Sequence, residues 1–212
     1  MKPEKIKAES EKVILQKKGK ICDWLPIIER SEKVRSNDEL INRALILNAL
    51  LNIYFQAPIH IIKDWIEQYN LTSSLSKSEK KLLNKKNSGL TEQEKINIYW
   101  SIESLWALMW VGGLISDLPI DKCVEDRQAK LCPNLEKGEN DSKFRSKMKI
   151  RTKEEIYKKL DLYFRAHWYT EDGRINNYPT GEINGDIIME RRKALEWAID
   201  STSDWDNIGM NT

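Results

Sequence analysis

The stretch TEQEKINIYWSIESLWALMWVGG, residues 91–113, decides the fold class. It opens with a Thr-x-x-Glu capping box, in which Thr91 caps a helix and Glu94 reaches back to it. It closes on Gly112 and Gly113, residues that commonly end helices. Between these signals, apolar residues recur three and four positions apart, which is the spacing of one helix face. The stretch predicts a helix over residues 92–111 with an apolar stripe of Ile96, Tyr99, Trp100, Trp106, Ala107 and Trp110.

The same start signal occurs twice more. Ser36 and Glu39 predict a helix that runs over residues 40–55, and Thr152 and Glu155 predict one that ends near Tyr169. We expect further helices over 59–69, near 78–86 and over 186–199. At the N-terminus we expect a loosely attached helix within 1–18, followed by an apolar strap over 21–28. Residues 114–142 should be mostly loop, and Asp172-Gly173 should form a turn.

The composition agrees with a helical protein. Glycine (9) and proline (6) together make up 15 of 212 residues, too few for a chain built from many tight β-turns. We therefore predict a mainly α, single-domain, multi-helix fold with at most a short β element near 143–151. Within it we distinguish an N-terminal helix and strap over 1–35 from a helical domain over 36–212.

The β element is suggested by an alternation between residues 143 and 153. Phe144, Met148 and Ile150 occupy even positions, and alternation is the period of a half-buried strand. Two interpretations are open: the solvated face of an edge strand, where lysines discourage aggregation, or a surface for an acidic partner. The odd positions are all basic: Lys143, Arg145, Lys147, Lys149, Arg151 and Lys153.

Charge and cysteine content narrow the class of protein. The 35 basic and 33 acidic residues leave a net charge of +2, whereas nucleic-acid-binding proteins usually carry a clear basic excess. The three cysteines lack zinc-ligand spacing and fit free thiols in a reducing compartment. Residues 1–20 contain no signal-peptide core, and no apolar run reaches the ~20 residues that span a bilayer. We expect a cytoplasmic protein with no membrane partner, no nucleic-acid partner, no metal and no cofactor.

Four predicted helices each place an ionisable side chain on their own apolar face. These side chains are Arg43, Glu103, His167 and Arg191. Because an unpaired charge is too costly to bury, such groups are normally paired. Glu103 is the only carboxylate of the four, so we expect it within salt-bridge reach of Arg43 or Arg191. Glu190 is a second possible carboxylate partner.

Three interpretations of this cluster are open. It could be a buried ion-pair network that fixes how the helices dock, or the side chains could extend to the surface. It could also be a ligand or catalytic site. In that case Glu103 or Glu190 would act as general base and His167 as acid or base, while Arg43 and Arg191 would hold an anionic substrate. Further binding candidates are Arg165 and the lining residues Trp100, Trp106 and Trp168.

Several segments resemble an uncharacterised bacterial family, the domain of unknown function 4272. They are RALIL (43–47), YWSIESLWAL (99–108), EIY (155–157) with RAHW (165–168), and ERRKALEW (190–197), followed by WDNI (205–208) and the terminal Thr212. The resemblance covers about residues 35–212 and implies no activity. The chain departs from the family pattern at Asn211 and in the long loop over 121–147. Positions that match the pattern include Arg43, Glu103, Arg165, His167, Glu190, Arg191, Trp205 and Asp206.

Two functional hypotheses follow. We favour a non-catalytic protein–protein interaction module of bacteria, an immunity-like or scaffold protein that binds an acidic, toxin-like partner through the basic stripe at 143–153. This hypothesis rests on the lack of a phosphate-binding loop, a nucleophile elbow or another catalytic motif. The alternative is an enzyme or small-anion-binding protein that uses the Arg/Glu/His cluster at the helix junction.

Overall fold

Helix α5 (Glu92–Val111) lies at the centre of the fold and has the bounds that the sequence predicts. The computed structural model describes residues 2–29 and 34–211, so the terminal Thr212 of the resemblance lies outside the described residues. The other α-helices are α1 (Pro3–Gln16), α2 (Asn37–Tyr54), α3 (Ile59–Gln68), α4 (Lys77–Leu82), α6 (Gln128–Leu131), α7 (Ser142–Lys147), α8 (Lys153–Ile175) and α9 (Gly185–Ile199), and two 3₁₀ turns cover Thr72–Ser74 and Asn87–Gly89.

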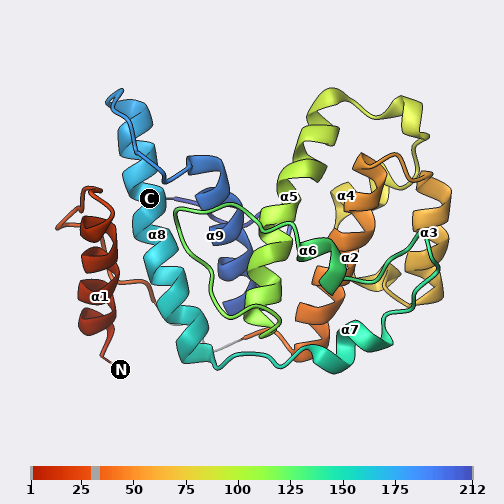
Figure 1. The fold of residues 1–212 in the computed structure, drawn as a ribbon, viewed down its shortest axis with the longest axis horizontal. Helices are drawn as coiled ribbons and strands as arrows, with labels where there is room; N and C mark the ends of the chain where they lie inside the picture. Colours follow the sequence, from red (N-terminus) through yellow and green to blue (C-terminus); the bar gives the residue numbers. More distant parts are fainter. Residues whose placement is uncertain (1, 30–33, 212) are drawn as a thin grey trace.

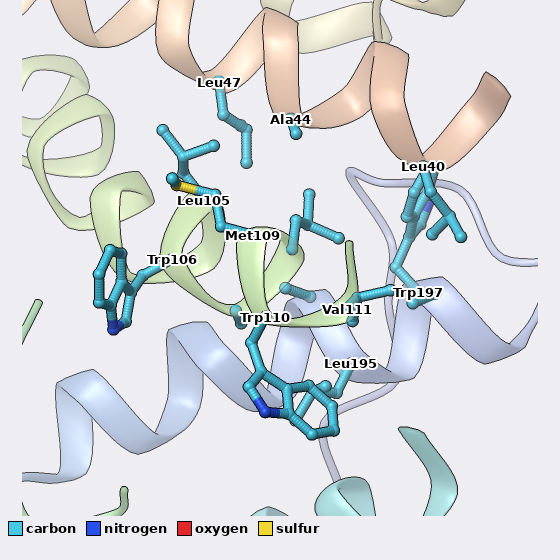
Figure 2. Packing of buried hydrophobic residues seen from close by; sticks show 14 of the residues in the cluster. Leu40, Ala44, Leu47, Leu105, Trp106, Met109, Trp110, Val111, Leu195 and Trp197 are labelled. Atoms are coloured by element: carbon cyan, nitrogen blue, oxygen red, sulfur yellow. The ribbon is translucent and has the colours of Figure 1, made fainter. Parts of the chain in front are cut away.

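The long helices stand side by side in the order α3, α2, α5, α9, α8, α1 (Figure 1). Helix α5 packs on α2 on one side and on α9 on the other, and its residues from Leu105 to Val111 are therefore all buried. Figure 2 shows this core, where Leu47 of α2 and Leu195 of α9 lie on either side of α5. Burying a large aliphatic side chain contributes about 1.5–3 kcal/mol, so this three-helix contact is a major source of stability.

The capping boxes start the helices where the sequence places them. Ser36, Thr91 and Thr152 each accept a hydrogen bond from the backbone N–H three residues later, and the glutamate there bonds back. Ser76 and Glu79 form a fourth box at α4. The mainly α fold is confirmed. None of the helices in the described part of the chain is long and apolar enough to cross a membrane.

The expected β element near 143–151 is wrong. Residues Ser142–Lys147 form α7, and the part of the chain that the structure describes contains no strand. Phe144 and Met148 are both buried. Their spacing of four residues places them on one face of a helix as readily as on one face of a strand. The alternation therefore did not distinguish the two structures.

After α7 the chain runs extended along the end of α5. The N–H groups of Lys149 and Arg151 donate to the carbonyls of Gly112 and Val111, each at 2.8 Å. These bonds satisfy carbonyls that have no partner within α5. Gly113 has a φ of +70°, and a Cβ there would lie 2.8 Å from the Lys149 carbonyl oxygen, so this close approach requires glycine.

Two further expectations differ from the structure. No turn occurs at Asp172-Gly173, because α8 continues to Ile175. The N-terminal helix is not loosely attached, since α1 packs along α8 and buries Ile6 and Ile14.

The apolar stripe of α5 is also only partly buried. Ile96 and Tyr99 are exposed, because the N-terminal part of α5 extends past α9 (Figure 1).

Candidate functional site

Glu103 and Arg191 form a buried ion pair between α5 and α9. The Glu103 Oε2 atom lies 2.8 Å from Arg191 Nε and 2.7 Å from Nη2. The two residues are only 2% and 0% exposed. The second carboxylate oxygen accepts a hydrogen bond from the Val124 N–H at 3.0 Å. The predicted contact between Glu103 and an arginine of the cluster is confirmed, and the arginine is Arg191 rather than Arg43.

The remaining donors of Arg191 hold the loop after α5. Nη1 donates to the Pro119 carbonyl at 2.6 Å and to the Tyr163 hydroxyl at 3.1 Å, and Nη2 donates to the Lys122 carbonyl at 2.8 Å. Burial alone would lower the pKa of Arg191, but Tyr163 and Glu103 outweigh it and raise this pKa above its ordinary value. Every nitrogen of the Arg191 guanidinium group is therefore hydrogen-bonded within the protein, which is typical of a structural arginine.

Arg43 pairs with Glu79, a residue that the sequence reasoning missed. Arg43 Nη1 lies 2.5 Å from Glu79 Oε1, and Nη2 donates to the Ser74 carbonyl. Both residues are buried. Glu79 is also the glutamate of the α4 capping box, so its Ser-x-x-Glu spacing from Ser76 was the signal that could have identified it.

His167 is buried against Arg192, the second missed residue. Its Nδ1 atom lies 2.6 Å from Arg192 Nη1. Burial first, and then the positive charge of Arg192, lowers the pKa of His167 to about 4. Arg192 also bonds Glu196 and the carbonyls of Met210 and Asn211. At neutral pH His167 is therefore an uncharged acceptor that helps to hold the C-terminal segment.

Arg165 joins the N-terminal segment to α8. It bonds both oxygens of Asp161, at 3.0 and 2.9 Å, and the carbonyl of Pro26 at 3.2 Å. Its Nη1 lies 3.8 Å from Glu11 Oε1, and neither of these two buried atoms has a hydrogen-bond partner. Arg165 thus connects α1 and the strap to the helical domain.

Glu190 lies apart from these pairs. Its Oε2 accepts a hydrogen bond from the Ser104 hydroxyl at 2.7 Å. It lines a cleft of about 360 Å³ whose apolar side includes Leu47 and Ile98 and which also contains Trp205. Because it lines this cleft, Glu190 is still a catalytic candidate, and Ser104 is its hydrogen-bond donor.

The three candidate tryptophans occupy different environments. Trp106 is fully buried in the main core. Trp100 is half-buried, with its ring centroid 5.8 Å from that of Tyr99. Trp168 lines a small gap beside Arg165 and Cys22. The structure thus brings together Glu103 with Arg191, while Arg43, Arg165, His167 and the tryptophans each have separate neighbours.

The basic residues between 143 and 153 divide into two groups. The arginines serve the fold: Arg145 bonds Asp141 at 2.5 Å, and Arg151 bonds the Trp110 and Ile115 carbonyls at 2.8 and 3.0 Å. The lysines at 143, 147 and 149 are exposed. Among the residues that the structure describes, these three lysines form no salt bridge.

Lys143 and Lys147 border a cleft of about 350 Å³ together with Lys130 of α6. We call it the lysine cleft. No ion pair to these three lysines occurs among residues 2–29 and 34–211. Glu139 is the only acidic side chain in the lining, so the cleft carries a net positive charge. The other lining residues are Ala129, Leu131, Cys132, Pro133, Asn134, Asn140 and Phe144.

The walls of the lysine cleft are fixed to the core. The Asn48 side chain of α2 donates to the Pro133 carbonyl at 3.1 Å, and the Trp65 indole of α3 donates to the Glu139 carbonyl at 3.2 Å. The Asn134 N–H binds the Glu139 carboxylate at 3.0 Å. Figure 1 shows α6 and α7 beside α2. The cleft is therefore held in shape before any partner binds, which lowers the entropic cost of binding.

The lining of the lysine cleft includes one cysteine, Cys132. Burial raises the pKa of Cys132 to about 12, so its sulfur stays a protonated thiol at neutral pH. No group of three or more His, Cys, Asp or Glu side chains that could hold a metal ion occurs in the described residues.

Comparisons with known proteins give one match. No curated protein and no solved structure matches the chain. A family match covers residues 6–208, which includes most of α1 and extends the resemblance beyond residues 35–212 toward the N-terminus. The chain therefore belongs to the family described as Domain of unknown function (DUF4272).

Proposed function

We propose that the protein is a non-catalytic interaction module, of the scaffold or immunity-like kind, that binds an acidic protein partner at the lysine cleft. The observation that carries the proposal is the contrast between Arg145 and Arg151, which bond within the fold, and the three exposed lysines of the cleft, which have no acidic partner in the described chain. A rigid basic cleft is complementary to an acidic segment and would steer its approach.

The buried cluster supports the same proposal. Every polar atom of the Glu103–Arg191 pair is bonded within the protein, and His167 is neutral. A general base and acid need access to substrate and a pKa near the working pH. Glu103 is enclosed by the protein, and the pKa of His167 lies well below neutral pH. Contacts that hold α5, α8 and α9 together need neither access to substrate nor such a pKa.

The test is the binding of a fluorescent, Asp/Glu-rich peptide to the full-length protein, measured by fluorescence anisotropy at several salt concentrations. The variant is Lys143→Glu/Lys147→Glu. Each exposed charge pair is worth up to ~1 kcal/mol, so reversing two charges should weaken binding roughly tenfold or more. Wild-type binding should also weaken as salt rises, because ions screen exposed charges.

The matched control is Lys77→Glu/Lys81→Glu, which reverses two exposed lysines with the same spacing on another six-residue helix, α4. It should bind the peptide within about twofold of the wild type. Equal losses in both variants would show general charge attraction and contradict the proposal. A short single-stranded DNA that binds more tightly than the peptide would also contradict it.

A further inference from the structure

We propose that a second cavity, at the start of α2, binds an oxyanion group of a ligand, either a phosphate or a carboxylate. Its volume is about 360 Å³, and it lies between α2, the loop over 73–76 and the segment over 203–205. We call it the arginine–tryptophan pocket. It shares no lining residue with the lysine cleft and does not depend on the function proposed there. The residues that carry the argument are Arg35, Arg43, Ser73, Trp197 and Trp205.

The first observation is an unsatisfied donor. Arg43 lines the pocket and is 97% buried, being 3% exposed, yet its Nε–H has no hydrogen-bond partner. Its other two nitrogens bind Glu79 and the Ser74 carbonyl. A buried charged donor without an acceptor is destabilising, and such groups are nearly always paired. The acceptor missing from the chain is one that a ligand oxygen would supply.

The second observation is a pair of guanidinium groups in one pocket. Burial lowers the pKa of Arg35, while Glu39 and Asp200 act in the opposite direction and the nearby positive charge of Arg43 makes a smaller lowering contribution. Glu39 binds Arg35, whose Nε and Nη2 also donate to the Trp197 and Ser203 carbonyls, and Glu79 binds Arg43. The buried donor of this pair that has no partner is therefore the Arg43 Nε–H. An anion placed between the two guanidinium groups would offset their repulsion, and guanidinium groups suit the geometry of phosphate and carboxylate.

The acidic residues of the lining are already occupied. Glu39 bonds Arg35 through Oε1 and the Ser36 N–H through Oε2, and Asp204 Oδ1 accepts from the Asp206 N–H. The hydroxyl group of exposed Ser73 can serve as a weaker donor to an anion.

Two tryptophans hold the guanidinium groups in place. The rings of Trp197 and Trp205 meet edge to face, with centroids 5.5 Å apart at 86°. The Arg35 guanidinium carbon lies 3.9 Å from the Trp197 ring centroid, and that of Arg43 lies 4.8 Å from the Trp205 centroid. Figure 2 shows Trp197 beside Leu40 of α2. Stacked arginines are preorganised, and the tryptophans also provide an intrinsic fluorescence signal for binding.

The experiment titrates sodium phosphate and, separately, sodium acetate into the full-length protein at constant ionic strength, with tryptophan fluorescence as the readout. Exposed Ser73 allows the charge of the pocket to be changed without altering either arginine. Ser73→Asp should weaken binding about fivefold and Ser73→Arg should strengthen it about fivefold, as expected for one unit charge near the anion in a wet site.

Ser88 provides the matched control, because it is exposed and occupies the middle of a three-residue 3₁₀ turn, as Ser73 does. Ser88→Asp and Ser88→Arg should leave the affinity unchanged. The Arg43 Nε–Hε signal in a ¹⁵N spectrum, identified by its loss in Arg43→Lys, should shift as the anion binds. The anion that saturates the signal identifies the group as phosphate or carboxylate.

Three results would overturn the proposal. The first is that neither anion gives a saturable change, which would mean that water alone fills the pocket. The second is an equal response of the Ser73 and Ser88 variants. The third is saturable binding that leaves the Arg43 Nε–Hε signal in place.

Discussion

Arg191 of α9 donates to Glu103 of α5 at 2.8 Å inside the core, 88 residues apart in sequence. The pair joins the two helices that make the central contact of the fold. A buried ion pair adds little net stability compared with an apolar pair, but loss of one partner leaves the other charge uncompensated. The contact therefore makes the fold sensitive to any change at either residue.

Glu103→Gln should lower the free energy of unfolding by about 3–5 kcal/mol, because Arg191 would keep its charge without a counterion. A domain of this size has roughly 5–15 kcal/mol in total, so the loss should be plain in urea unfolding followed by circular dichroism.

Glu92→Gln is the control for this prediction. Glu92 lies on the same helix, but its side chain is 83% exposed and pairs with Lys95 at the surface. Its loss should cost less than about 1 kcal/mol. If the two variants lose equal stability, the Glu103–Arg191 pair is not the source of the effect.

His167 should make the stability depend on pH in the acidic range. Its folded pKa is about 4, below the ordinary value of 6.5, because of burial and Arg192. The unfolded chain therefore binds a proton below pH 6.5 that the folded protein takes up only near pH 4, and stability falls as the pH drops through this window. The total loss is about 3 kcal/mol, at 1.36 kcal/mol per pKa unit.

The comparison is with His167→Asn, whose side-chain oxygen can still accept from Arg192 but does not titrate. Unfolding free energies of both proteins should be measured in urea at pH 7 and pH 4.5. The wild type should lose about 2–3 kcal/mol more than the variant over this interval. The neighbouring Glu196, whose pKa burial raises, titrates in both proteins and cancels from the difference. Parallel losses would show that His167 is not held neutral.

Local signals predicted most of the fold. Helix α5 matches its predicted bounds because a capping box and two glycines mark its ends, independently of tertiary contacts. The Glu103–Arg191 contact was predictable because Glu103 was the only carboxylate on an apolar face. Spacing alone did not separate helix from strand at Phe144 and Met148.

The partners of the other candidates depend on tertiary packing. The Ser-x-x-Glu spacing marks Glu79 as a capping residue, but nothing local pairs it with Arg43, 36 residues away. Arg192 follows Arg191 directly, and helix geometry points neighbouring side chains in different directions. One therefore meets Glu103 and the other meets His167.

Gly173 is another position whose environment depends on tertiary packing. The Asp-Gly sequence predicts a turn there, but the structure has a continuous helix. A Cβ at this position would lie 2.6 Å from Thr180 Cγ2 and 3.1 Å from the Tyr178 carbonyl oxygen. The backbone oxygen cannot move as freely as a side chain. Gly173→Ala should therefore destabilise the protein by about 1–3 kcal/mol, despite the higher helix propensity of alanine.

Gly185→Ala provides the contrast. Gly185 is the first residue of α9, and a Cβ there would meet only Thr170 side-chain atoms, at 3.4 and 3.6 Å, which is ordinary contact. Alanine gains up to about 1 kcal/mol over glycine in a helix, so this variant should be neutral or more stable. The melting temperature of Gly173→Ala should therefore lie below that of the wild type, whereas that of Gly185→Ala should equal or exceed it. A Gly173→Ala protein that melts at or above the wild-type temperature would show that the segment over 178–180 does not pack against α8 as described.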